Sequence, residues 1–225
     1  MIERKFTREK FKEYCVEKFI SSSLKNVGHS HTKVVRTPLG EKIIIFASRP
    51  GLIVGRKGEN IKKLTNTLKK KFDFENPEIE ISEVEYPNLD AQIVAERIAS
   101  TLERFGIQKF KAIGHKTMQD VMNAGALGVE IVISGKVPSA RATSWRFYKG
   151  YLKKSGDLAL TAIRKAQATA FMKTGCIGVK VSIMPADIKS PDNIKVLRDV
   201  KEEKKPELMA ESKSKEEVKN EVQGA

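Results

Sequence analysis

One short segment constrains the fold of this chain more than any other: the tetrapeptide Gly55-Arg56-Lys57-Gly58 lies between an apolar turn and an amphipathic helix. Apolar residues after the second glycine recur at helical spacing: Ile61, Leu64, Leu68 and Phe72. The other face of that helix carries lysines: Lys62, Lys63, Lys69 and Lys70. Glycines let a backbone approach a sugar-phosphate chain closely, and a helix start offers free N–H groups to a phosphate. The segment therefore predicts a clamp on a nucleic-acid backbone, with a tight turn and solvated cations as the alternative.

The residues around this segment predict a helix and three strands. An apolar stripe at helical spacing indicates a helix that Thr7 caps: Phe11, Tyr14, Cys15 and Phe19. Because Cys15 lies on the stripe, it is expected to be a buried structural thiol rather than a reactive one. The strands are predicted over 32–37, 41–47 and 78–81, with a turn at 38–40 and a break at 49–51. The continuous apolar run 43–46 is typical of a strand covered on both faces.

After residue 88 the pattern predicts two helices and then strands. Asp90 caps the first helix, Leu89 and Val94 are placed for a hydrophobic staple, and Gly106 ends it. Its expected core stripe is Val94, Ile98, Leu102 and Phe105. The second helix is expected from Phe110 to Asn123, with one apolar half: Phe110, Ile113, Met118 and Val121. Strands are predicted over 128–133 and 178–183, and the period of 161–173 fits either a helix or a strand, of which the neighbouring strands favour the strand.

Two segments of this second half mix cations with other residues in a way that suits RNA. The polar half of helix 110–123 holds Lys111, His115 and Lys116, which could contact a single strand or form a solvated helix face. The stretch 141–154 interleaves rings with Arg and Lys, as expected for phosphate contact plus base stacking. Its rings could instead pack a core. We expect both, with Trp145 or Phe147 pointing inward and the cations outward.

The charge of the chain favours a polyanionic partner. There are 42 Lys and Arg against 28 Asp and Glu, a formal net charge of +14. Residues 201–225 hold six Lys and seven Glu, net −1, so the first 200 residues carry +15. The end of the chain, 191–225, is therefore predicted to be a charged, mostly disordered tail. The basic surplus of the remainder is typical of nucleic-acid binding, because neutralised phosphates release counterions.

Several function classes are not supported by the residues. Two cysteines, Cys15 and Cys176, are too few for a disulfide framework or a Cys-rich zinc module. No metal site is expected, since His29 and His31 have only a distant Cys15 as a soft ligand. Nucleotide-binding glycine loops and a placed nucleophile–base pair are also missing. No apolar stretch approaches the ~20 residues that span a bilayer, and the first twelve residues do not resemble a secretory signal. We expect no cofactor, no membrane partner and no enzymatic activity.

The combination of segments resembles one ribosomal family. The order helix, two strands, Val-Gly-Arg-Lys-Gly-x-x-Ile, helix, strand is similar to a type II KH domain. The second half resembles the C-terminal domain of universal small-subunit ribosomal protein three. The segments that carry this likeness are 128–136, 140–142, 154–156 and 178–184. The Lys-Ser-Gly step and the Ile-Met-Pro strand end look like the archaeal and eukaryotic branch.

The resemblance implies a fold class and a set of partners. The expected fold is α/β (α+β), with a type II KH domain over 1–88, a second α/β domain over 89–190 and the tail over 191–225. The family's role implies a cytoplasmic, ribosome-bound structural protein of the small subunit. Its expected partners are small-subunit rRNA in the head, mRNA at the entry channel and neighbouring head proteins. The alternatives are a nucleic-acid enzyme such as an abasic-site lyase and a free-standing KH regulator of RNA.

The predicted RNA-binding residues follow from the pattern and the resemblance together: Gly55, Arg56, Lys57, Gly58, Lys62, Lys63, Lys111, His115, Lys116, Arg141, Arg146 and Lys149. Family members use the helix that matches Phe110–Lys116 at the mRNA entry channel, where basic residues are implicated in unwinding. Many members carry two adjacent cations after the Phe, and this chain has Lys111 followed by Ala112. The resemblance therefore implies a weaker unwinding contribution from this helix.

Overall fold

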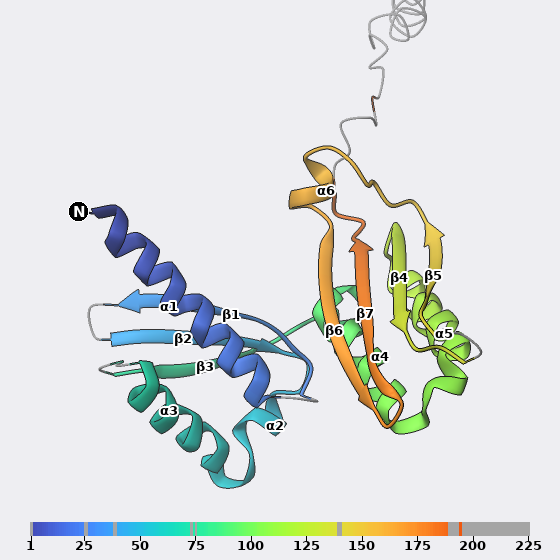
Figure 1. Cartoon of the computed structure of the whole chain (residues 1–225). Helices are drawn as coiled ribbons and strands as arrows, with labels where there is room; N and C mark the ends of the chain where they lie inside the picture. Colours follow the sequence, from blue (N-terminus) through green and yellow to red (C-terminus); the bar gives the residue numbers. More distant parts are fainter. Residues whose placement is uncertain are drawn as a thin grey trace, which may run out of the picture. The chain divides into compact units, whose positions relative to one another are not determined.

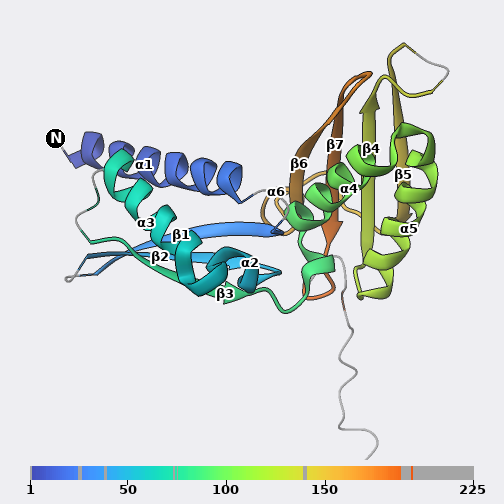
Figure 2. The same cartoon turned by 90° about the horizontal axis from the view of Figure 1, so that it is seen from below.

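The chain contains two sheets, and the main helices of each pack on one face of it (Figure 1, Figure 2). The computed structural model describes residues 2–24, 27–37, 40–72, 74, 76–138, 141–188 and 194. The helices are α1 (Ile2–Ser23), α2 (Pro50–Val54), α3 (Glu59–Phe72), α4 (Ala91–Phe105), α5 (Phe110–Asn123) and α6 (Leu158–Thr161). The strands are β1 (His29–Thr37), β2 (Gly40–Ala47), β3 (Glu78–Glu83), β4 (Gly128–Gly135), β5 (Thr143–Gly150), β6 (Arg164–Met172) and β7 (Gly175–Met184). The predicted fold class, a KH-like part followed by a second α/β part, is confirmed.

The first sheet has the strand order β1-β2-β3. β1 and β2 are antiparallel, whereas β2 and β3 are parallel. A parallel pair needs a crossover connection, and α2 with α3 provides it. The core lies between the helices and one face of the sheet, where the largest fully buried side chains are Ile20, Ile43, Ile45, Ile53 and Leu68.

The predicted apolar stripe of the first helix is wrong at Phe11, Tyr14 and Cys15, whereas Phe19 packs against the core. Phe11 and Tyr14 are 67% and 50% exposed, and Cys15 is only half-buried. The buried stripe is Val16 and Ile20, which are also four residues apart and meet the sheet with small aliphatic side chains. The cap is wrong as well. Because the helix begins at Ile2, the hydroxyl of Thr7 lies inside it and donates to the carbonyl of Glu3 at 2.7 Å.

The apolar run of β2 is covered fully on one face only, which corrects the prediction for 43–46. Ile43 and Ile45 are buried, whereas Ile44 and Phe46 on the other face are half-buried. The reason is that α1, α2 and α3 all pack on the same side of the sheet (Figure 2). On the open side the ring of His31 stacks on Phe46, with centroids 4.3 Å apart.

The second sheet has the order β5-β4-β7-β6, and all neighbours are antiparallel. α4 and α5 cover one face, and the core between them and the sheet includes Ile98, Leu102, Ile131, Ile133, Val179, Val181 and Ile183. As predicted, Asp90 caps α4: its carboxylate accepts from the backbone N–H of Gln92 at 3.0 Å. Gly106 ends the helix, and the N–H of Gly106 donates to the carbonyl of Leu102.

Three further predictions for the second half have different outcomes. Phe105 does not join the α4 core stripe, because it is the last residue of the helix and is 57% exposed. Phe147 is the inward ring of β5, and Trp145 is partly exposed. The predicted strand 161–173 is confirmed with a later start, since Thr161 ends α6 and β6 begins at Arg164.

The predicted tail 191–225 lies outside the described residues, apart from Ile194. Within the described part of the chain, no helix is both long and apolar enough to cross a membrane.

Candidate nucleic-acid interface

The loop Gly55–Gly58 has an unusual backbone. α2 ends at Val54, its C-cap Gly55 has φ +69°, and a 3₁₀ turn follows over Arg56–Gly58. Within it Lys57 has φ +53° and Gly58 has φ +76°. Lys57 is the one non-glycine among the described residues with a positive φ. Such conformations cost free energy and persist where the surroundings impose them, which is typical of functional sites.

The two glycines of the loop do different work. A Cβ on Gly55 would lie 2.5 Å from the amide nitrogen of Asn60, so the first glycine gives room to that side chain. The Nδ2 of Asn60 donates to the carbonyl of Leu52 at 3.3 Å and ties α3 back to α2. A Cβ on Gly58 would meet nothing within 4 Å, so the second glycine serves the left-handed backbone and leaves open space beside it. Asn60 is a site residue that sequence reasoning missed.

The cations of this region are exposed but differ in their surroundings. Arg56, Lys57 and Lys62 are all on the surface. Lys63 forms an i,i+4 ion pair with Glu59 at 2.5 Å, and that hydrogen bond lowers the pKa of the Glu59 carboxyl. The positive charge of Lys63 is therefore largely compensated by Glu59 within α3. Arg56 and Lys57 are exposed on the loop. Leu52 and Val54 add exposed apolar surface on the neighbouring helix, α2.

The predicted polar half of α5 is present and is braced by rings of β5. Lys111, His115 and Lys116 are exposed. The ammonium of Lys111 lies 4.6 Å from the centroid of the Trp145 ring, a cation–π distance. The ring of His115 meets Phe147 edge-on at 5.1 Å. The structure thus brings the cations of α5 together with the aromatic side of β5.

The mixed segment 141–154 is divided between the two faces of the second sheet. Phe147 points to α5, so strand alternation places Lys149 on that side and Arg146 on the opposite one. Arg141 is exposed before β5 begins. The predicted residues Arg141, Arg146 and Lys149 therefore do not form one surface with α5.

A carboxylate that sequence reasoning missed organises the side of Arg146. Glu130 of β4 accepts from Nε of Arg146 and from Nζ of Lys154, the latter at 3.1 Å. Its side chain is only 15% exposed, whereas those of its two partners are about half exposed, at 51% and 53%. The sequence held one signal for this role: Glu130 is the single acid in the otherwise apolar strand sequence Gly-Val-Glu-Ile-Val-Ile.

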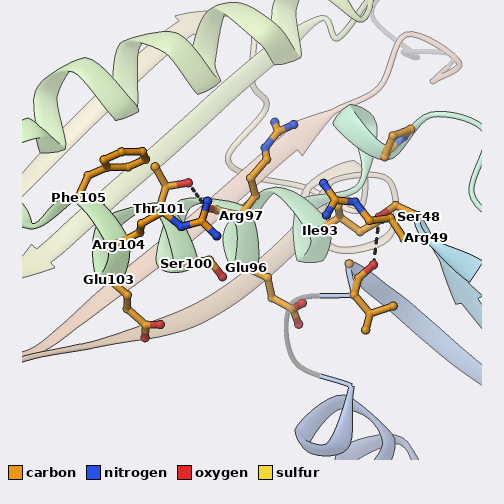
Figure 3. Close-up of a pocket in the computed structure, with 13 residues that line it drawn as sticks. Ser48, Arg49, Ile93, Glu96, Arg97, Ser100, Thr101, Glu103, Arg104 and Phe105 are labelled. Atoms are coloured by element: carbon orange, nitrogen blue, oxygen red, sulfur yellow. Dashed lines mark hydrogen bonds between the residues drawn. The ribbon is translucent and has the colours of Figure 1, made fainter. Parts of the chain in front are cut away.

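A surface groove of about 740 Å³ runs along α4 (Figure 3). Glu96, Ser100 and Glu103 point to one side of the helix, and Arg97 points to the other. Burial raises the pKa of the Glu96 carboxyl, whose Oε2 is buried without a hydrogen-bond partner in the described structure.

Across the described residues, no group of three or more His, Cys, Asp or Glu side chains could hold a metal ion.

Comparisons with known proteins agree with this geometry. Residues 16–89 match the family model of the KH domain, and residues 98–183 match that of the ribosomal protein S3 C-terminal domain. The chain is 44% identical over 199 residues to small ribosomal subunit protein uS3 of Methanocaldococcus jannaschii, covering 88% of this chain and 95% of that protein. It is 41% identical to the uS3 proteins of Methanoregula boonei and Methanococcus maripaludis, over 200 and 197 residues. These alignments cover 89% and 88% of this chain and 86% and 92% of the two relatives.

Proposed function

The chain belongs to the uS3 family of small-subunit ribosomal proteins, and we propose that its loop Gly55–Gly58 is the principal contact with small-subunit rRNA in the head. Its role is that of a structural ribosomal protein that binds rRNA. The observation that carries the proposal is the loop backbone: Lys57 and Gly58 both have positive φ, and two exposed cations flank an open space. A phosphate chain can approach such a backbone closely, while Arg56 and Lys57 neutralise it.

The test reverses the charge of the loop and keeps both glycines. Asp accepts the left-handed conformation that position 57 requires, so the variant Arg56→Asp/Lys57→Asp should keep the fold. It should weaken binding to a head-domain rRNA transcript at least tenfold. The slope of log affinity against log salt should become shallower by about 1.4, at ~0.7 per phosphate contact in single strands.

A matched control lies on the same element. Lys69 and Lys70 are adjacent, exposed and at the other end of α3. The variant Lys69→Glu/Lys70→Glu makes the same change in net charge and should bind the transcript within about threefold of the parent chain, since only long-range charge is altered. Equal losses in the two variants would mean that net charge, not the loop, holds the RNA.

The α5 side of the second sheet supports a second contact, with mRNA at the entry channel. The specific observation is that Lys111 and His115 are held by the rings of Trp145 and Phe147, which fixes them at the surface of α5. Ala112 lacks the charge that many family members have at this place, so the contact should be weaker here than in those relatives. The proposal also includes contacts with neighbouring proteins of the small-subunit head and a cytoplasmic, ribosome-bound location.

The two alternatives find less support. A lyase needs a lysine whose pKa is lowered so that its amine is neutral. Two of the described lysines, Lys18 and Lys42, have a shifted pKa, and hydrogen bonds with Tyr14 and Glu80 raise both. A free-standing KH regulator would not require the second domain that residues 98–183 match.

A further inference from the structure

One face of the second sheet is open over its centre. α4 and α5 pack on the other face, and α6 covers only the end near Met184 (Figure 1, Figure 2). Strand pairing sets the side chains of this face in rows. The first row is Tyr148, Glu130, Ser182 and Lys165. The second is Arg146, Val132, Lys180 and Gln167, and the third is Ser144, Ser134, Gly178 and Thr169. We refer to these twelve positions as the open face.

The open face is positively charged although it contains a carboxylate. Glu130 accepts hydrogen bonds from both Arg146 and Lys154, so one negative charge is shared between two positive charges. Lys180 is exposed on a central strand, and Nζ of Lys165 donates to the carbonyl of Ala159 at 2.6 Å. Three cations of the open face, and Lys154, which follows β5 and contacts Glu130, therefore stand against one acid, a net of three positive charges. Such a surface complements a polyanion.

The remaining side chains favour RNA over a protein partner. Tyr148 is 51% exposed, and the guanidinium of Arg146 lies 5.4 Å from its ring centroid. The ring is thus presented at the surface beside a cation, as in stacking platforms for bases. Val132 is the one aliphatic residue with a large side chain among the twelve positions, whereas the centres of protein interfaces are apolar. Gln167, Thr169 and the serines supply hydrogen-bond donors and acceptors instead.

We propose that the open face is a second RNA-binding surface, which takes an unpaired segment of small-subunit rRNA. A base stacks on Tyr148, and the adjoining phosphates lie against Lys180 and Arg146. The ion pair with Glu130 offsets part of the charge that Arg146 brings to this contact. Four-stranded sheets that stack bases on exposed rings are a recurring solution in RNA-binding proteins. The proposal rests on the proposed rRNA-binding function and adds a site to it.

The test removes the ring and the central cation together. In the full chain, Tyr148→Thr/Lys180→Thr places good strand formers at two exposed positions, so the fold should persist. Its affinity for a head-domain rRNA transcript should fall roughly five- to hundredfold, as expected for a lost stacking contact. The matched control Tyr86→Thr/Lys33→Thr removes one exposed ring and one exposed lysine outside the open face and should bind within about twofold of the parent. Tyr148→Phe keeps the ring and should retain binding.

The outcomes separate this site from the loop Gly55–Gly58. Weak binding by the open-face variant, with retained binding by its control, supports the proposal whether or not the Arg56→Asp/Lys57→Asp variant is also weak. If the loop variant binds normally in that case, the proposed loop contact fails and the open face stands. An open-face variant that binds like the parent overturns the inference alone. If that variant binds RNA normally but is lost from small subunits in a sucrose gradient, the face meets a protein and the inference is also overturned.

Discussion

The two sheets share one architecture, helices on one face and an open face on the other, but their open faces differ in charge. On the first sheet Lys42 pairs with Glu80 at 2.8 Å across neighbouring strands. Lys33 and Glu78 complete two lysines against two glutamates on that face, and the half-buried Ile44 lies among them. The open face of the second sheet has three cations, Arg146, Lys165 and Lys180, against the single acid Glu130, which Lys154 also contacts. The first face is therefore electrically balanced, whereas the second leaves positive charge for a partner.

This difference shows that covering one face of a sheet does not decide the use of the other. In the proposed function, the KH-like part binds RNA through a loop, where backbone geometry and not the sheet presents the charge. On the open face of the first sheet, polar and aromatic side chains already contact one another, as His31 does when it stacks on Phe46. In the second part the turn that leads into α5 has one glycine, Gly106, in place of two, and the sheet itself offers the ring and the cations.

The largest effect should separate covered from open positions on both sheets. Ile131 and Ile43 are fully buried under helices, and each substitution Ile→Ala there should cost about 2–5 kcal/mol of unfolding free energy. Val132→Ala and Ile44→Ala on the open faces should cost about 1 kcal/mol or less. Urea denaturation of the four variants measures this. A cost at Ile44 as large as at Ile43 would mean that the first sheet is covered on both faces after all.

A pH effect of similar size should be confined to the first sheet. Burial, with help from the nearby His31, lowers the pKa of His29 to about 4. As the pH falls below about 6.5, the unfolded chain binds this proton before the folded chain does. The stabilisation is thus complete above pH 6.5 and is lost progressively down to about pH 4. The loss should be about 3 kcal/mol, at ~1.36 kcal/mol per pKa unit.

The control for this prediction removes the titrating ring. His29→Gln can keep a hydrogen bond near Thr32, which now lies 2.8 Å from Nε2 of His29. Unfolding of the parent and of this variant is followed between pH 7 and pH 4.5. The variant should lose less stability than the parent over this range, and parallel pH profiles would rule out His29 as the cause.

The loop Gly55–Gly58 could be predicted from sequence because its determinants are local. Glycine spacing and the following helical stripe lie within about twenty residues, and both glycines have the positive φ that such a turn requires. The orientation of α1 could not be predicted. Both the Phe11/Tyr14 stripe and the Val16/Ile20 stripe are helical, and only contact with the sheet selects the second.

The role of Glu130 was hidden for a different reason. Its partners come from β5 and from Lys154, which is 24 residues away in sequence. Sequence placed Arg146 and Lys149 in one cationic segment, but a period of two sends them to opposite faces. Which face meets α5 is set by the room that Gly114 leaves for Phe147: a Cβ there would lie 2.7 Å from the ring. The partners of Glu130 and the face that meets α5 therefore become evident only in the folded sheet.

A smaller effect should distinguish the two sides of the second sheet. Lys111→Ala/Lys116→Ala removes two exposed cations on the α5 side and leaves the core residues of that helix unchanged. In reconstituted subunits, the salt slope for a 12-nucleotide single-stranded RNA should become shallower by about 1.4, at ~0.7 per contact. Tyr148→Thr/Lys180→Thr subunits are the comparison and should keep the parent slope, because the open face is assigned to rRNA. If both variants change the slope equally, the two sides do not have separate partners.

The smallest effect compares one acid from each open face. Glu130→Gln and Glu80→Gln make the same change in net charge on the two sheets. Gln at position 130 frees Arg146 and Lys154 from a shared negative charge, so the open face should gain up to one phosphate contact and its rRNA salt slope should steepen by about 0.7. Gln at position 80 releases Lys42 on a face whose exposed ring, His31, is already stacked on Phe46, so the slope should stay unchanged. Filter binding of the head-domain transcript across a salt series measures both slopes.

A steeper slope for Glu80→Gln would show that local charge alone recruits RNA. The ring and the strand geometry of the second sheet would then not be what selects RNA. An unchanged slope for Glu130→Gln would mean that the carboxylate holds Arg146 in place without limiting its charge.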